Sequence, residues 1–127
     1  MDRYDPHVPP APEEWLALDE QERIDLVEDY HRRARIRLPR AKAHAIIHAV
    51  IENQIALGDE IPVQRAVQRL MSEGLDRHEA LHAAGSVLAG HMNDLLSRPK
   101  RKPGADPNAA YYAALERLTA EDWLRSG

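Results

Sequence analysis

Cysteine and phenylalanine are both absent from this chain of 127 residues, and aromatic residues make up only 5% of it. Without cysteine, neither a disulfide framework nor a thiolate zinc site can form. The hydrophobic core must therefore consist mainly of aliphatic side chains, and Ala and Leu dominate among them. This composition favours helices, and the length is that of one domain.

Long hydrophobic runs and excess positive charge are also missing. No apolar run approaches the 18 residues that a membrane-spanning helix needs, and the first residues do not resemble a signal peptide. The formal net charge of −4 argues against a protein that binds nucleic acid through electrostatics. We therefore expect a cytoplasmic protein that binds neither membranes nor nucleic acid.

Helix caps and apolar periodicity predict an all-α fold, a small bundle of about four main helices followed by a short C-terminal helix. Asp19 with Glu22, and Asp76 with Glu79, have the spacing of capping boxes at helix starts. Proline and glycine are spaced to begin and end the helices between them. The expected helices span residues 19–33, 39–57, 62–74, 76–96 and 108–118.

The distribution of proline divides the chain into four segments. Four of the nine prolines lie within residues 1–18, which we expect to run as an extended arm over the surface, with Trp15 holding its end to the body. Residues 19–97 form the helical core. Residues 98–107 have the composition of a basic Pro/Gly linker, and residues 108–127 form a C-terminal helical segment that packs on the core.

Basic residues cluster where the first core helix ends, at Arg32, Arg33, Arg35 and Arg37. Positive charge at a helix C-terminus complements the helix dipole, so a solvated helix end explains the cluster. The alternative is a patch that binds an anion or nucleic acid, which the acidic total charge disfavours.

Histidines form the most informative pattern of the sequence. His78-Glu79-x-x-His82 has the spacing that places two imidazoles on one helix face beside a carboxylate, and His44-x-x-x-His48 repeats the spacing on an earlier helix. Short loops and a third helix of about 18 Å bring the start of the fourth helix to the level of the first pair. If the two faces meet, four imidazoles converge.

The segment His44-x-x-x-His48-x-x-x-Glu52-Asn53-Gln54, followed by His78-x-x-x-His82, resembles a family of short uncharacterised bacterial all-helical proteins, a domain of unknown function. That family carries a His-x-x-x-His helix running into Glu-Glu-Gln and then a second His-x-x-x-His helix. The resemblance covers about residues 40–96 and implies a site but no reaction. The chain departs from the pattern at Asn53 and Ser86, where an acid is expected, which argues against a symmetric two-carboxylate, two-metal site.

Three hypotheses for the function follow. In the first, His44, His48, His78 and His82 bind a divalent transition metal, Zn or Fe, with Glu52 completing or supporting the shell. In the second, the protein is a small zinc hydrolase in which Glu79 activates water, although the capping box already accounts for Glu79. In the third, the protein is a non-catalytic adaptor or homo-oligomer whose histidines are structural. The sequence names no substrate and leaves open whether the protein is an enzyme.

Overall fold

The computed structural model describes residues 1–97 and 106–126, and within these ranges all regular elements are helical. The predicted all-α fold is thus confirmed. The elements are α1 (Pro12–Ala17), α2 (Glu20–Arg33), α3 (Ala41–Ala56), the short 3₁₀ helix η1 (Gly58–Glu60), α4 (Val63–Ser72), α5 (Arg77–Ser97), α6 (Ala109–Arg117) and α7 (Ala120–Ser126). None of the helices described is long and apolar enough to cross a bilayer.

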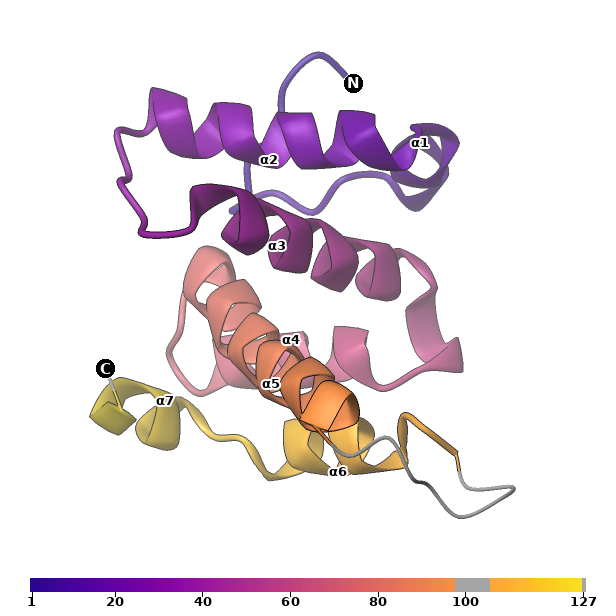
Figure 1. Cartoon of the computed structure of the whole chain (residues 1–127), viewed down its shortest axis with the longest axis vertical. Coiled ribbons are helices and arrows are strands. Elements are labelled where there is room, and N and C mark those ends of the chain that lie inside the picture. Colours follow the sequence, from indigo (N-terminus) through magenta and orange to yellow (C-terminus); the bar gives the residue numbers. More distant parts are fainter. Residues whose placement is uncertain (98–105, 127) are drawn as a thin grey trace.

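Helix α3 is the central element, because it contacts α1 and α2 on one side and α4 and α5 on the other (Figure 1). The smaller hydrophobic cluster joins α3 to α2, α1 and the N-terminal segment through Val27, Trp15 and Tyr4. The larger cluster joins α3 to α4, α5, α6 and α7. A helix that serves two cores must be apolar on opposite faces, as the sequence of α3 is.

Three consecutive residues near the end of α3 fasten the layers together. The carboxylate of Glu52 pairs with Arg77 at the start of α5. The side-chain oxygen of Asn53 accepts hydrogen bonds from Trp15 Nε1 of α1 at 2.8 Å and from Arg23 of α2 at 3.1 Å. Gln54 accepts a hydrogen bond of 2.7 Å from the hydroxyl of Tyr111 in α6. Successive residues of a helix point about 100° apart, so each one reaches a different neighbour.

The caps of α2 and α5 fit the sequence pattern to different degrees. Asp19 and Glu22 form the predicted capping box of α2, with both reciprocal bonds present. Asp76 caps α5, since its carboxylate accepts from the backbone N–H of Glu79 at 2.8 Å. The carboxylate of Glu79 does not return to Asp76 among the described contacts and accepts instead from Trp123 Nε1 at 3.4 Å. The α5 cap is therefore half of the predicted box.

The N-terminal segment differs from the predicted extended surface arm in two ways. Residues 12–17 form the helix α1, which Pro12 can begin because the first turn of a helix needs no N–H donor there. Tyr4 and Pro6 are both almost completely buried, whereas most other residues before α1 are exposed, so the segment runs over the surface with two side chains inserted into the body. The prediction that Trp15 is held in the body is confirmed, since its side chain has no exposed surface.

At the other end of the chain, Tyr111 and Leu115 of α6 and Ala120 of α7 are buried in the larger hydrophobic cluster. The C-terminal helices are therefore part of the packed body. Most of the predicted basic linker, residues 98–105, lies outside the described residues.

Candidate metal centre

Five imidazole rings from three helices meet between the two hydrophobic clusters. They belong to His31 of α2, His44 and His48 of α3, and His78 and His82 of α5. The ring centroids of His78 and His82 lie 4.3 Å apart, and those of His44 and His82 lie 4.6 Å apart. His31 lies 4.9 to 6.1 Å from the other four rings. The predicted convergence of the two histidine pairs is confirmed, and a fifth histidine joins them.

Four of these five residues can hold a metal ion. His31, His48, His78 and His82 each offer one ring nitrogen, and these four nitrogens all lie within 4.8 Å of one another. In a tetrahedral zinc site with Zn–N bonds of about 2.0–2.1 Å, neighbouring ligand atoms are about 3.4 Å apart. The limit of 4.8 Å is wide enough to include the nitrogen spacing of such a site.

The tautomer of His31 follows from its hydrogen bond. Its Nδ1 lies 2.8 Å from the backbone carbonyl oxygen of Val27, one helical turn earlier. A carbonyl oxygen only accepts hydrogen bonds, so the proton of the neutral ring is on Nδ1. The lone pair is then on Nε2, which is buried and has no hydrogen-bond partner among the described residues. This is the arrangement expected of a metal-binding histidine held in place by a carbonyl group.

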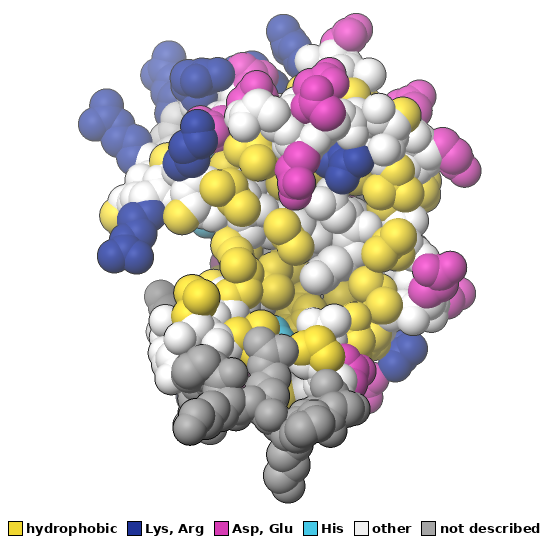
Figure 2. All heavy atoms as spheres, turned by 45° about the vertical axis from the view of Figure 1, so that its right-hand side comes forward, with side chains coloured by type: hydrophobic (Ala, Val, Ile, Leu, Met, Phe, Trp, Pro, Cys, Tyr) yellow, Lys and Arg dark blue, Asp and Glu magenta, His cyan; other side chains and the backbone are white. Residues whose placement is uncertain are grey.

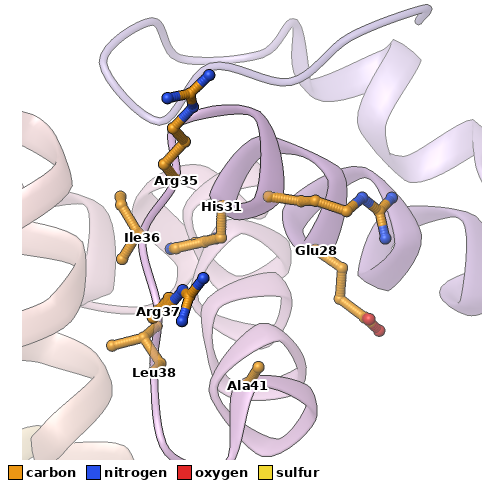
Figure 3. A pocket seen from close by; sticks show the side chains of 8 residues that line it. Glu28, His31, Arg35, Ile36, Arg37, Leu38 and Ala41 are labelled. Carbon is orange, nitrogen blue, oxygen red and sulfur yellow. The ribbon is translucent and has the colours of Figure 1, made fainter.

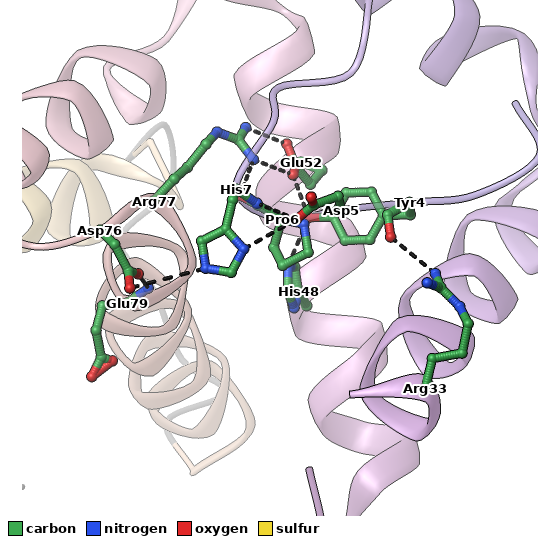
Figure 4. Close-up of polar contacts among 10 residues, drawn as sticks. All are labelled: Tyr4, Asp5, Pro6, His7, Arg33, His48, Glu52, Asp76, Arg77 and Glu79. Atoms are coloured by element: carbon green, nitrogen blue, oxygen red, sulfur yellow. Dashed lines mark hydrogen bonds and ion pairs between the residues drawn. The ribbon is translucent and has the colours of Figure 1, made fainter. Parts of the chain in front are cut away.

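The tautomer of His48 is set by Tyr4, as Figure 4 shows. The hydroxyl of Tyr4 donates to the carboxylate of Glu52 in a short hydrogen bond. Because the hydroxyl has only one proton, its oxygen must accept from His48 Nε2, which lies 2.8 Å away. The lone pair of His48 is therefore on Nδ1, again buried and without a partner in the described part of the chain.

The cluster accounts for half of the buried polar side-chain atoms that lack a partner. Six such atoms occur among the described residues, and three of them are His31 Nε2, His48 Nδ1 and His78 Nε2. A buried polar atom without a hydrogen bond destabilises a fold by about 1–3 kcal/mol, so three together call for an explanation. A metal ion bound by the ring nitrogens of these three histidines would account for all three.

Burial favours the neutral form of four of these imidazoles, those of His44, His48, His78 and His82. Desolvation, together with the neighbouring imidazoles, lowers the pKa of His78 to about 3 and that of His44 to about 4. Burial and the proximity of His31 lower the pKa of His82 to about 4. The pKa of His48 is lowered well below its ordinary value, again mainly by burial. Neutral imidazole is the form that binds metal, so the cluster is ready to bind near neutral pH.

His44 and Glu52, which the sequence predicted as ligands, are not among the four candidate ligands but lie close to them. Nε2 of His44 lies 3.0 Å from Nε2 of His82, so His44 contacts one of the four candidate ligands directly. The carboxylate of Glu52 is engaged by the guanidinium of Arg77 at 2.7 and 2.8 Å and by Tyr4. Glu52 therefore supports His48 through the Tyr4 hydroxyl and does not approach the open nitrogens.

Glu79, the candidate base of the hydrolase hypothesis, points away from the histidines (Figure 4). Its carboxylate contacts Trp123 of α7. On α5, His78 and His82 face the cluster, whereas Glu79 faces α7.

His31, Tyr4 and Arg77 are the residues that sequence reasoning missed. His31 carried a usable signal, because it follows Ile24 and Val27 on the apolar stripe of α2 with helical spacing. Tyr4 had no such signal, since it lies in a proline-rich segment without periodicity. Arg77 at the start of α5 was assigned no role from the sequence, yet the residue is only 5% exposed and also donates to the carbonyl of Pro6 at 2.9 Å.

Two pockets adjoin the cluster, and both include Leu38 of the segment that connects α2 to α3. One, of about 780 Å³, is lined by His31 and by Arg32, Arg35 and Arg37 (Figure 3). The other, of about 530 Å³, lies between α3 and α5 and is lined by His44, His48 and His82. On the face shown in Figure 2, hydrophobic side chains line a hollow between the upper and lower parts of the molecule, with basic side chains at its upper left.

Comparison of the chain with protein-family models, with curated proteins and with solved structures finds no match. Arguments about function therefore rest on the residues of the site itself.

Proposed function

We propose that this protein binds one divalent transition metal ion through His31, His48, His78 and His82. The observation that carries the proposal is the convergence of one ring nitrogen from each of four histidines, together with the buried lone pairs of His31 and His48, whose tautomers are set by Val27 and Tyr4. A purely structural cluster would have no reason to leave these lone pairs without hydrogen bonds, because each one lowers stability.

We propose that the bound ion is zinc or iron. We also propose that the protein is cytoplasmic. Neutral imidazoles suit both metals, and four nitrogen ligands from three helices fit the tetrahedral geometry that zinc prefers. Glu52 would act behind the ligands: its carboxylate holds Tyr4, and Tyr4 holds the ring of His48. We also propose, from its two His-x-x-x-His motifs alone, that the protein belongs to the uncharacterised bacterial family that its sequence resembles.

A hydrolase that uses Glu79 receives less support. A general base must reach the water bound to the metal, and the contact of Glu79 with Trp123 directs its carboxylate toward α7. Binding of the metal, and not a hydrolytic reaction, is thus the proposed function.

Metal analysis of untagged protein, expressed in medium supplemented with transition metals, tests the proposal. We expect about one equivalent of zinc or iron per chain. His31→Gln is the decisive variant, because only the three-dimensional arrangement includes His31, and it should lose most of the bound metal. His44→Gln should retain it.

His91→Gln is the matched control, since His91 stacks on Tyr111 of α6, with ring centroids 5.5 Å apart, and is not among the candidate ligands. The proposal is wrong if the wild-type protein contains no stoichiometric metal, or if His31→Gln binds as much as His91→Gln does.

A further inference from the structure

The pocket between α3 and α5, called here the α3–α5 pocket, shares His48 and His82 with the proposed metal ligands and extends beyond them. Its volume of about 530 Å³ is within the range of about 300–1,000 Å³ that small-molecule sites occupy. Residues of α3, α5, α7 and the segment between α2 and α3 line it. Four parts of the chain thus line one open pocket of the size of a small organic molecule.

The walls of the α3–α5 pocket are mostly apolar. Ile47, Leu81 and Trp123 contribute the large side chains, and Gly85 and Ala89 leave room between them. A Cβ atom at Gly85 of α5 would lie 3.1 Å from Cγ2 of Ile47 of α3, so glycine at this position lets the two helices approach closely. An apolar molecular body would bury its surface against these side chains.

Positive charge is confined to one rim of the pocket. Arg40 is the one formally charged side chain among the described residues that line it, and Asp and Glu are missing from that lining. Arg40 is also the N-cap of α3, where no side chain caps the helix and its first turn holds no acid. The uncapped backbone N–H groups and the guanidinium therefore both favour an anion at this rim.

A second polar feature lies deeper in the pocket. His48 lines it, is only 3% exposed, and has the buried Nδ1 without a partner among the described residues. His44 and His82 stand beside it. The pocket thus runs from a positively charged rim along apolar walls to the histidine cluster.

We propose that the α3–α5 pocket binds a small carboxylic acid with an apolar body. The carboxylate lies at Arg40 and the start of α3, and the body extends along Ile47, Leu81 and Trp123 toward the histidines. An uncharged or cationic molecule of the same shape would pack against the apolar walls but would not be attracted electrostatically to Arg40 at the rim. This inference goes beyond metal binding, because the rim and walls belong to residues outside the proposed ligand set.

Calorimetric titration of the full chain with octanoate tests the inference, in parallel with octanol and octylammonium. The protein is measured both as isolated and after removal of metal with a chelator, so that failure of the metal proposal does not decide the result. We expect saturable binding of octanoate at one site per chain and at least tenfold weaker binding of the other two probes. Trp123 lies in the wall and Trp15 is fully buried elsewhere, so tryptophan fluorescence should change with saturation.

Variants separate the rim from the walls. Arg40→Asn removes the charge while keeping a residue that tolerates the positive φ of 73° at this position, and it should weaken octanoate binding at least tenfold. Arg35→Asn is the matched control, because Arg35 also has a positive φ, of 58°, on the same segment but does not line this pocket. Ala89→Leu fills the pocket and should abolish binding, whereas Ala113→Leu on exposed α6 surface should not.

The inference is overturned if octanoate does not bind the wild-type protein saturably, or if octanol binds equally well. Equal effects of Arg40→Asn and Arg35→Asn would overturn it too, since the attraction would then be nonspecific.

Discussion

Two groups of buried polar side chains lie next to each other between α3 and α5, and they differ in how completely they are hydrogen-bonded. Glu52 and Arg77 form an ion pair through two contacts of 2.7 and 2.8 Å, and Tyr4 and Pro6 supply further bonds. One turn along α3, His48 begins a cluster in which three buried nitrogens have no partner in the described part of the chain.

The difference separates a structural role from a binding role. A buried network with every group paired stabilises one arrangement of the chain, in this case the N-terminal segment against α3 and α5. A buried cluster with open lone pairs lowers the stability of the metal-free protein and is suited to gain a ligand. The hydroxyl of Tyr4 connects the two groups, because it contacts both Glu52 and His48.

Among single substitutions, breaking the ion pair should have the largest effect on stability. Glu52→Ala leaves Arg77 buried and uncompensated, and we expect a loss of about 3–5 kcal/mol in the free energy of unfolding, measured by urea denaturation. The exposed pair of Arg65 and Glu116 is the matched control: Glu116→Ala should change stability by less than about 1 kcal/mol. Similar effects of the two variants would show that the buried network is not structural.

Lowering the pH should reduce the free energy of unfolding, because the histidine cluster resists protonation. The pKa of His44 and His82 is about 4 and that of His78 about 3, against 6.5 for an ordinary histidine. Between pH 6.5 and 4 the unfolded chain therefore binds protons that the folded cluster does not, so stability must fall as the pH falls. The slope is at most about 1.4 kcal/mol per pH unit for each such histidine.

Urea midpoints of the metal-free protein at pH 7.5, 6 and 5 measure this effect. His78→Gln removes one of the histidines and should make the decline shallower. A midpoint that stays constant from pH 7.5 to 5 would contradict the expected neutral, buried state.

Removing the hydroxyl of Tyr4, which contacts both Glu52 and His48, should have a smaller effect on stability. It should also weaken metal binding. Tyr4→Phe should lower the free energy of unfolding by about 1–3 kcal/mol, because Glu52 and His48 each lose a buried hydrogen bond. It should also weaken metal binding by about 10–100-fold, since the ring of His48 is no longer held.

Tyr111→Phe is the control for this variant. It removes a hydroxyl that donates to Gln54 at 2.7 Å and that does not contact the five clustered histidines. Competition with a chelating dye measures metal affinity, and equal losses in the two variants would refute the link between Tyr4 and the metal site.

The smallest effects are expected at the start of α5, where the cap and the motif carboxylate can be separated. Asp76→Ala removes the side-chain cap and should lower stability by about 0.5–2 kcal/mol. Glu79→Gln changes only the weak 3.4 Å contact with Trp123 and should lower stability by less than about 0.5 kcal/mol, with metal content unchanged. Loss of metal in Glu79→Gln but not in Asp76→Ala would restore Glu79 to the site.

Local signals in the sequence predicted much of the helical framework. The carboxylate of Asp19, the glycine after α3 and the cap at Asp76 act within a few residues of chain, so their effects can be read without knowing the fold. The i, i+4 spacing of His44 with His48 and of His78 with His82 likewise places each pair on one face of its own helix. The residues that complete the site are distant in sequence: Tyr4 contacts His48 across 44 residues.

The amino-acid sequence by itself therefore determined the helices and the two histidine faces, because propensity, capping and periodicity are properties of neighbouring residues. Only the tertiary structure decided which side chains share the buried space between those faces. It brought His31 into the cluster, directed Glu52 toward Arg77 and Tyr4, and turned Glu79 toward Trp123. Such choices depend on how whole helices pack and on where each buried polar group finds a partner, and no short stretch of sequence contains that information.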